Sequence, residues 1–309
     1  MTRTTIPVGV GAGLAAMLLM AALLTQTAVA FPLFILSPLP LAVAGFAFGP
    51  LAAAIGAVTV TAGVAFAAGP ASAVAALVLI AGPTVWITYV LGLSRQRADG
   101  TVEWYPYGRA LLQASVMVGL GLILVGLVTD FDAERLTAEA VSAMQAWLAG
   151  SPTPINRDQI ETLMKVYVAV LPYTTAAGAL AMLAINGYLG ARVAETSGRL
   201  KRTREPLWTT QFPPAAAVLF LVAAGLAFLP GTIGDAAGAF AGALGFGFAL
   251  VGLAALHALT RDSLSRGFIL AMAYAFVLLF GLSLILLAVL GIADSLIDLR
   301  SRQSRRPTS

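Results

Sequence analysis

The sequence predicts an all-α membrane protein, a polytopic transmembrane helix bundle with eight to nine spans. Of its 309 residues, 59% are hydrophobic and only 10% are charged, whereas a soluble globular domain carries roughly 25% charged residues. Its mean hydropathy is +0.91. Several apolar runs reach the ~20 residues that an α-helix needs to cross the hydrocarbon layer. A transmembrane β-barrel would instead show short segments of alternating polarity.

Composition also excludes several classes of function. The chain has no Cys and a single His, which excludes disulfides, thiolate metal sites and Cys nucleophiles and argues against a His-rich zinc site. The net charge is +4, but the Lys and Arg residues sit in loops between apolar runs. This pattern is typical of cytoplasmic loops in membrane proteins rather than of a nucleic-acid interface. We therefore expect the lipid bilayer as partner, no nucleic acid and no cofactor.

The first apolar run, Ile6 to Ala30, has two interpretations. It is long enough to be a retained first span, although Arg3 and the small residues Ala28 to Ala30 also resemble a cleavable signal peptide. Gly9 and Gly13 lie on one helix face. Such a face of small residues serves either a helix contact inside the bundle or the docking of a partner. Gln26 is one of the few polar residues in the apolar runs and is a candidate for a substrate cavity or for helix packing.

The second predicted span, Phe31 to Phe48, contains three prolines. Proline removes a backbone donor and disfavours helix at the residue before it. We expect a kinked span or one that begins with a non-helical piece. Because irregular backbone at membrane depth needs protein or water around it, Ser37, Pro38 and Pro40 are candidates for a cavity wall. A plain kinked helix is the alternative.

Three further spans are predicted before a long polar insert. They cover Leu51 to Ala68, Ala71 to Leu93 and Ala110 to Val128, and Gly49-Pro50 and Gly69-Pro70 punctuate them. Trp104, Tyr105 and Tyr107 precede the third of these spans, and we interpret them as interfacial anchors.

The insert, at about residues 130–165, shows apolar residues at helical spacing from Leu136 to Leu148. We expect an amphipathic helix on the outer interface, a break at Ser151 to Pro154, and a helix start capped by Asn156 with Gln159. The insert is either a lid over a cavity or a loop resting on lipid.

The sixth predicted span runs from about Val166 to Leu189 and holds the last two candidates, Tyr173 and Asn186. An Asn in a lipid-embedded helix needs a partner, so Asn186 should face other helices. A basic loop at residues 193–210 follows, with Arg199, Lys201, Arg202 and Arg204. It separates a membrane unit at residues 1–192 from C-terminal helices at residues 211–299. We interpret this loop as a cytoplasmic topological anchor rather than a site.

The C-terminal region predicts spans at Phe212 to Leu229, Ala236 to Leu259 and Gly267 to Ile292, then a basic tail at residues 300–309. Nine crossings place the tail outside, against the positive-inside rule, whereas one re-entrant segment would leave eight crossings. Asp294 and Asp298 share a helix face and either pair with Arg300 or Arg302 or bind a divalent ion. The default for His257 is a side chain that snorkels to the surface.

Several short stretches resemble the YybS-like family of predicted bacterial membrane proteins of unknown function, which is itself similar to the S components of energy-coupling-factor vitamin transporters. They are Ser37-Pro38-Leu39-Pro40, Asn186-Gly187-Tyr188-Leu189 with Ala191-Arg192, Pro206 to Trp208, and Leu290-Gly291-Ile292-Ala293-Asp294 with Asp298 and Arg300. The resemblance implies an S-component-like six-helix core with a cavity on the extracytoplasmic side. The appended C-terminal helices depart from a vitamin-binding S component.

Two functions fit these observations. The first is a small-molecule binding or transport-type subunit of a bacterial cytoplasmic (inner) membrane, working with other membrane subunits or a separate ATPase module, because the chain has no phosphate-binding G-x-x-x-x-G-K-[ST] motif. The scarcity of polar residues in the spans then favours a mostly apolar ligand. The second is a non-transporting scaffold or regulator. We expect no enzyme, since no carboxylate pair, zinc motif or Ser-His pair lies within the spans.

Overall fold

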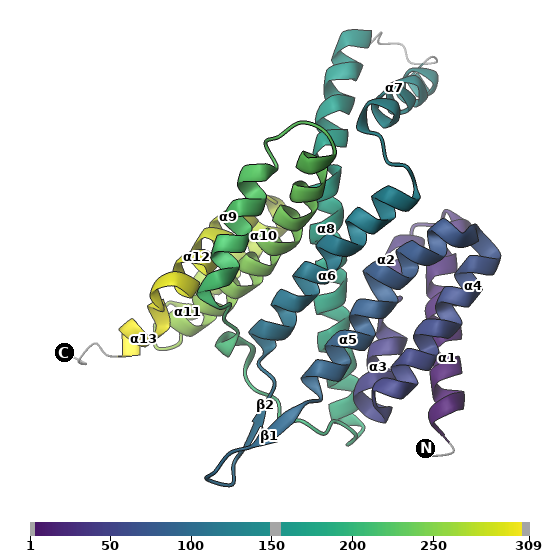
Figure 1. Ribbon diagram of the computed structural model, residues 1–309. Helices are drawn as coiled ribbons and strands as arrows, with labels where there is room; N and C mark the ends of the chain where they lie inside the picture. The colour runs from purple at the N-terminus through teal and green to yellow at the C-terminus, as the bar shows by residue number, and fades with distance from the viewer. Residues whose placement is uncertain (1–3, 149–155, 305–309) are drawn as a thin grey trace.

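The computed structural model describes residues 4–148 and 156–304, and in these residues the all-α prediction is confirmed (Figure 1). The predicted break at Ser151 to Pro154 and the last five residues, 305–309, lie outside the described residues. The elements in chain order are α1 (Thr5–Ala21), η1 (Ala22–Thr25), α2 (Ala30–Ile35), α3 (Leu39–Phe48), α4 (Pro50–Ala76), η2 (Leu77–Ala81), α5 (Gly82–Leu91), β1 (Ser94–Gln96), β2 (Val102–Trp104), α6 (Tyr107–Val128), α7 (Ala133–Leu148), α8 (Arg157–Thr196), η3 (Leu207–Thr209), α9 (Pro214–Leu226), α10 (Thr232–Leu259), α11 (Arg266–Leu279), α12 (Ser283–Ile297) and α13 (Leu299–Ser304).

Within the described residues, six helical stretches are long and apolar enough to cross a membrane. They are Thr5–Thr25, Ala30–Phe48, Pro50–Leu91, Tyr107–Val128, Arg157–Thr196 and Thr232–Leu259. Three shorter apolar helices, α9, α11 and α12, accompany them. The chain is therefore a membrane protein by the length and composition of its helices, as its hydropathy predicts.

The N-terminal helices α1 and α4 pack through glycine. A Cβ atom on Gly13 would lie 2.5 Å from the Gly56 carbonyl oxygen, and one on Gly9 would lie 2.7 Å from the Ala52 carbonyl oxygen. Only glycine permits this approach of two backbones. The small-residue face of the first span therefore forms a contact inside the bundle.

Two breaks divide the following helices as the sequence predicts. Pro38 lies between α2 and α3 and Pro40 in the first turn of α3, and the amide of Leu39 donates to Leu36 rather than continuing the α-helical pattern. Gly69 has a φ of +85°, a backbone conformation that favours glycine, and Pro70 follows it. The chain reverses here, within α4 (Figure 1), so the single stretch Pro50–Leu91 contains the two predicted spans.

The polar insert forms α7, which packs against the first turns of α8. Val141 of α7 is buried against Ile160 and Met164 of α8, so a helix with one buried apolar face forms where the sequence predicts it. Asn156 caps α8 by accepting a hydrogen bond from the amide of Asp158. From there α8 runs unbroken for 40 residues past Pro172. One element was not predicted from the sequence. The loop after α5 forms a two-stranded antiparallel hairpin of β1 and β2.

The prediction of one helix from Gly267 to Ile292 is wrong. Phe280 is extended (φ −134°, ψ 96°), and it separates α11 from α12. Arg261, which precedes α11, stacks 5.7 Å from the centre of the Trp208 ring, and Arg300, which follows α12, donates to the Trp208 carbonyl oxygen. Because both residues contact the same tryptophan, the chain leaves and returns at one end of the bundle.

Candidate functional site

Four of the residues proposed from sequence lie at the turn after α1 and at the break between α2 and α3. Gln26 is exposed, with a φ of +51°, at the end of the turn after α1. Ser37 and Pro38 are fully buried at the break between α2 and α3, and Pro40 is half-buried in the first turn of α3. Their positions are those of chain reversal and helix packing.

Asn186 of α8 forms a hydrogen bond with the backbone at the break between α2 and α3. Its side-chain amide donates to the carbonyl oxygens of Ile35 and Met182, both at 2.7 Å. The Ile35 carbonyl lies in the last turn of α2, where the chain stops supplying helical donors. The fully buried Asn186 therefore faces other helices, as the sequence predicts, and joins α8 to the α2–α3 break.

Tyr173 also serves packing. Its ring fills the space above Gly238 of α10, where a Cβ atom would lie 2.9 Å from the ring. Its hydroxyl donates to the Ala227 carbonyl oxygen at 3.3 Å. This residue ties α8 to the turn between α9 and α10.

A cavity of about 890 Å³ lies between α8 and the C-terminal helices. This volume lies in the ~300–1,000 Å³ range of small-molecule sites. None of the six residues proposed from sequence lines it. Its apolar wall comes from α3, α5, α6, α8 and α10, with the side chains Phe46, Ile87, Leu91, Leu111, Ala114, Leu180, Leu183, Ala184, Leu250, Leu253 and Ala254.

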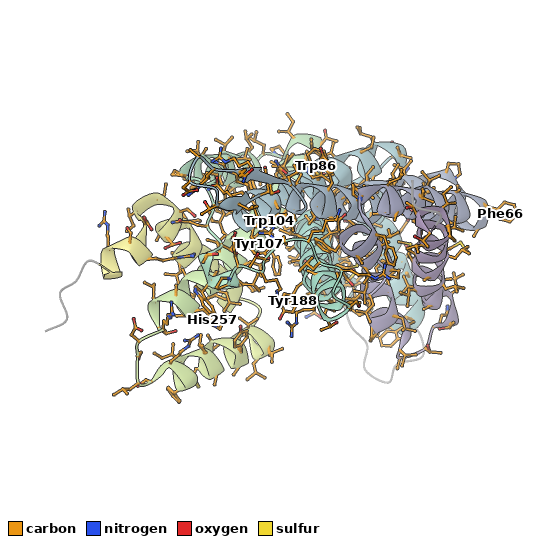
Figure 2. All side chains as sticks on the ribbon, turned by 90° about the horizontal axis from the view of Figure 1, so that it is seen from below. Phe66, Trp86, Trp104, Tyr107, Tyr188 and His257 are labelled. Atoms are coloured by element: carbon orange, nitrogen blue, oxygen red, sulfur yellow. The ribbon has the colours of Figure 1, made fainter. Side chains whose placement is uncertain are left out.

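The polar end of the cavity is formed by residues 202–210, the loop predicted to be only a topological anchor. Figure 2 looks up at this end and labels Tyr107, Tyr188 and His257, which lie around the cavity. The cavity is thus at the end of the bundle that carries the basic loop. In Figure 1 α7 lies at the opposite end, so α7 does not cover this cavity.

Arg202 is the most buried charge in this loop, with only 5% of the residue exposed. One guanidinium nitrogen donates to the carbonyl oxygens of Leu91 and Tyr105 at 3.3 Å, and the group lies 4.1 Å from the centre of the Tyr107 ring. Burial lowers the pKa of Arg202, while Tyr107 and Glu205 oppose that effect. The burial of the charged Arg202 side chain at the cavity wall therefore costs free energy.

Two more cations line the same end. Arg204 pairs with Glu195 at 2.9 Å and stacks 5.1 Å from the centre of the Tyr188 ring. Arg266, at the start of α11, is half-buried, and no ion pair of Arg266 is recorded in the part of the chain that the structure describes. Among the described residues, Glu205 is the single carboxylate that lines the cavity, and Glu195 neutralises Arg204 from outside it. Three cations against these two anions leave this end positive.

A hydrogen-bonded pair completes the polar end. Nε2 of His257 lies 2.9 Å from the hydroxyl of Tyr274 on α11, so the His257 ring has a hydrogen-bond partner within the protein. Both side chains line the cavity. They can donate or accept hydrogen bonds toward a bound group.

Arg300, in the C-terminal segment, forms hydrogen bonds with the backbone of the basic loop. Arg300 donates to the carbonyl oxygens of Trp208 and, at 2.8 Å, Thr210, and both residues line the cavity. Arg300 also pairs at 2.9 Å with Asp294, which is fully buried. The prediction that Asp294 pairs with Arg300 is confirmed, and no group of three His, Asp or Glu able to hold a metal occurs within residues 4–148 and 156–304.

The sequence did hold a signal for this site. Tyr188 and Trp208 flank the basic loop on either side, and aromatic rings next to Arg are able to stack on it. Tyr188 and Trp208 entered the prediction only through the family resemblance, and the arginines were interpreted as a topological anchor, so the prediction missed that the loop folds inward. Comparisons of the chain with protein-family models, with curated proteins and with solved structures find no match.

Proposed function

We propose that this protein is a small-molecule binding or transport-type subunit of a bacterial cytoplasmic membrane, with no ATPase of its own. The observation that carries the proposal is the cavity of about 890 Å³, walled by apolar side chains and closed at one end by polar ones. A few polar groups in a mostly apolar pocket are what ligand sites share. Energy for transport would come from a separate ATPase module or another membrane subunit.

The distribution of charge supports a cytoplasmic location for the cavity end. The β1–β2 hairpin, with Arg95 and Arg97, lies at the lower end of the bundle in Figure 1, where the loop that follows α8 also lies. Arg261 and Arg300 join that loop at Trp208. Under the positive-inside rule this end faces the cytoplasm. The return of the chain after α12 favours eight crossings with α11 and α12 as a re-entrant pair.

The relation to the YybS-like family and an S-component-like core in the first six spans remain part of this proposal. The proline-broken second span and Asn186 are among the residues that carry the resemblance. In the structure these two features contact each other through the Ile35 carbonyl. That contact supports a shared architecture for the core.

Filling the cavity tests the proposal. Ala184 lines the cavity on α8, so Ala184→Trp should displace a bound molecule. Ala65→Trp on the exposed face of α4 is the matched control. Each protein is purified with its native lipids and analysed by native mass spectrometry for bound small molecules and subunits.

We expect a reproducible bound molecule on the unaltered protein and on the Ala65→Trp variant, and its loss from the Ala184→Trp variant. If all three proteins carry the same molecules, the cavity is not a binding site. Co-purifying protein subunits without any small molecule would favour the alternative, a non-transporting scaffold or regulatory protein.

A further inference from the structure

The polar end of the cavity holds more positive charge than the protein neutralises. Nε and Nη2 of Arg202 are buried without a hydrogen-bond partner in the described part of the chain. Nη2 lies 3.8 Å from a carboxylate oxygen of Glu205, which is within ion-pair distance but too far for a hydrogen bond. A buried, incompletely paired cation costs free energy that a bound anion would offset.

The cations and the hydrogen-bonding groups stand around one space. Arg202 and Arg204 reach it from the loop, Arg266 from α11, and the His257–Tyr274 pair from between α10 and α11. Guanidinium groups bind phosphate and carboxylate oxygens through two parallel hydrogen bonds. This end is therefore built to receive an oxyanion.

The rest of the cavity is built for hydrocarbon. Its wall between α6, α8 and α10 carries only apolar side chains such as Leu111, Leu183 and Leu253. Four lining residues are each more than 40% exposed: Ile185 and Tyr188 on α8, Leu207 in the loop and Tyr274 on α11. The cavity thus opens sideways between α8 and α11, where lipid chains lie against a membrane helix.

We propose that the ligand is a membrane amphiphile with a phosphomonoester headgroup, bound with its head at Arg202, Arg204 and Arg266 and its chain along the apolar wall. This inference rests on the proposed function and names the ligand class of the same cavity. Charge complementarity selects the head, the apolar wall selects the chain, and the lateral opening selects the bilayer as the source.

The test compares two lipids that differ in the head alone. The full chain is placed in nanodiscs of phosphatidylcholine, and native mass spectrometry measures the binding of lysophosphatidic acid and of lysophosphatidylcholine with the same acyl chain. Lysophosphatidic acid should bind about tenfold more tightly, because its phosphomonoester carries more negative charge for the arginines and has no cationic choline beside it. Inorganic phosphate alone should not compete at equal concentration, because it lacks the chain.

Arg266→Gln is the informative variant, because Arg266 forms no ion pair within the described residues, and its loss therefore leaves no carboxylate unpaired there. It should weaken lysophosphatidic acid binding about tenfold and leave lysophosphatidylcholine unchanged. Arg109→Gln, at an exposed arginine outside the cavity, should change neither. Thermal unfolding of both variants checks that they fold.

The outcomes separate the two proposals. Equal binding of both lipids in the cavity, lost in Ala184→Trp, would overturn the phosphomonoester headgroup while the binding function stands. Competition by inorganic phosphate at equal concentration would overturn the amphiphile. Binding of lysophosphatidic acid that neither Ala184→Trp nor Arg266→Gln weakens would contradict both proposals.

Discussion

Two helix pairs in this molecule close on glycine, and they differ in what else holds them. α1 and α4 meet at Gly13 and Gly56, and neither helix carries a charged residue. α10 and α12 meet at Gly252 and Gly291, where added Cβ atoms would lie 1.8 and 2.1 Å from backbone oxygens of the facing helix. Only the second pair also takes part in a buried ion pair, between Asp294 of α12 and Arg300 of α13.

The difference shows where the fold is coupled to the cavity. The α1–α4 contact braces the N-terminal helices and contributes no side chain to the cavity. Arg300 of α13, which follows α12, instead binds the backbone of Trp208 and Thr210, which line the cavity. Packing of α12 on α10 is thereby linked to the shape of the loop that carries Arg202 and Arg204. A change in the second pair should therefore alter binding as well as stability.

The largest expected effect comes from breaking the ion pair. Arg300→Met leaves the carboxylate of Asp294 buried without its partner, which typically costs about 3 kcal/mol or more. The free energy of unfolding, measured in mild detergent with a chemical denaturant, should fall by that amount, and lysophosphatidic acid binding should weaken too.

The double variant Asp294→Leu, Arg300→Met is the control for this prediction. It removes both charges and should recover most of the lost free energy of unfolding, because apolar residues of similar volume often replace a buried pair without loss. It should not recover binding, since the carbonyls of Trp208 and Thr210 still lack their donor. Full recovery of binding would show that Arg300 does not hold the loop.

Adding one methyl group tests the apolar pair. Gly13→Ala forces a carbon to within 2.5 Å of the Gly56 carbonyl oxygen, so α1 and α4 must move apart, at a cost of about 2 kcal/mol. Gly11→Ala is the matched control, because nothing lies within 4 Å of a Cβ atom there. Thermal unfolding should distinguish the two variants. Ligand binding by Gly13→Ala at temperatures where it remains folded should be unchanged, and a loss would show that this pair is coupled to the cavity as well.

The smallest effect concerns an exposed charge cluster that serves as a contrast to the buried pair. Hydrogen bonds from Arg97 and then Arg95 lower the pKa of Glu103 from 4.5 to about 2. Since its pKa in the folded protein lies below the unfolded value, the stabilisation of the hairpin is present above pH 4.5 and is lost as the pH falls toward 2.

The protection factors of the β1 and β2 amides, obtained from hydrogen exchange relative to unstructured peptides at the same pH, should therefore fall as the pH is lowered over this range. In Glu103→Gln the protection factors should already be low at neutral pH and should not fall further in acid. A pH dependence that survives in Glu103→Gln would assign it to another group. The cavity loop and its ligand should respond little to the state of this hairpin, because Arg95 and Arg97 do not line the cavity.

Local sequence patterns predicted much of the framework. Apolar runs of about 20 residues identified the membrane helices, since the hydrocarbon thickness sets their length. Proline and glycine located the breaks at Pro38 and Gly69, since each acts on the backbone of its own neighbourhood. The same local logic predicted α7 from its apolar spacing and the pairing of Asp294 with Arg300.

The site depended on contacts between residues far apart in the chain. Arg202 lies 111 positions from Leu91, whose carbonyl it binds, and Arg300 lies 92 positions from Trp208. Nothing in the local pattern distinguishes an arginine that anchors a loop at the membrane surface from one that folds inward to line a cavity. The break at Phe280 was likewise hidden, because an apolar run of 26 residues reads the same whether it is one helix or two.

The amino-acid sequence by itself thus determined that the chain is helical, that it lies in a membrane and where its basic loops occur, because these properties follow from hydrophobicity and local backbone preference. Only the tertiary structure decided that α12 returns the chain to the basic end, that Asn186 and Tyr173 serve packing, and that the basic loop closes a cavity. The physical reason is that buried charges and cavities exist only where several helices meet, and that meeting is set by packing across the whole chain.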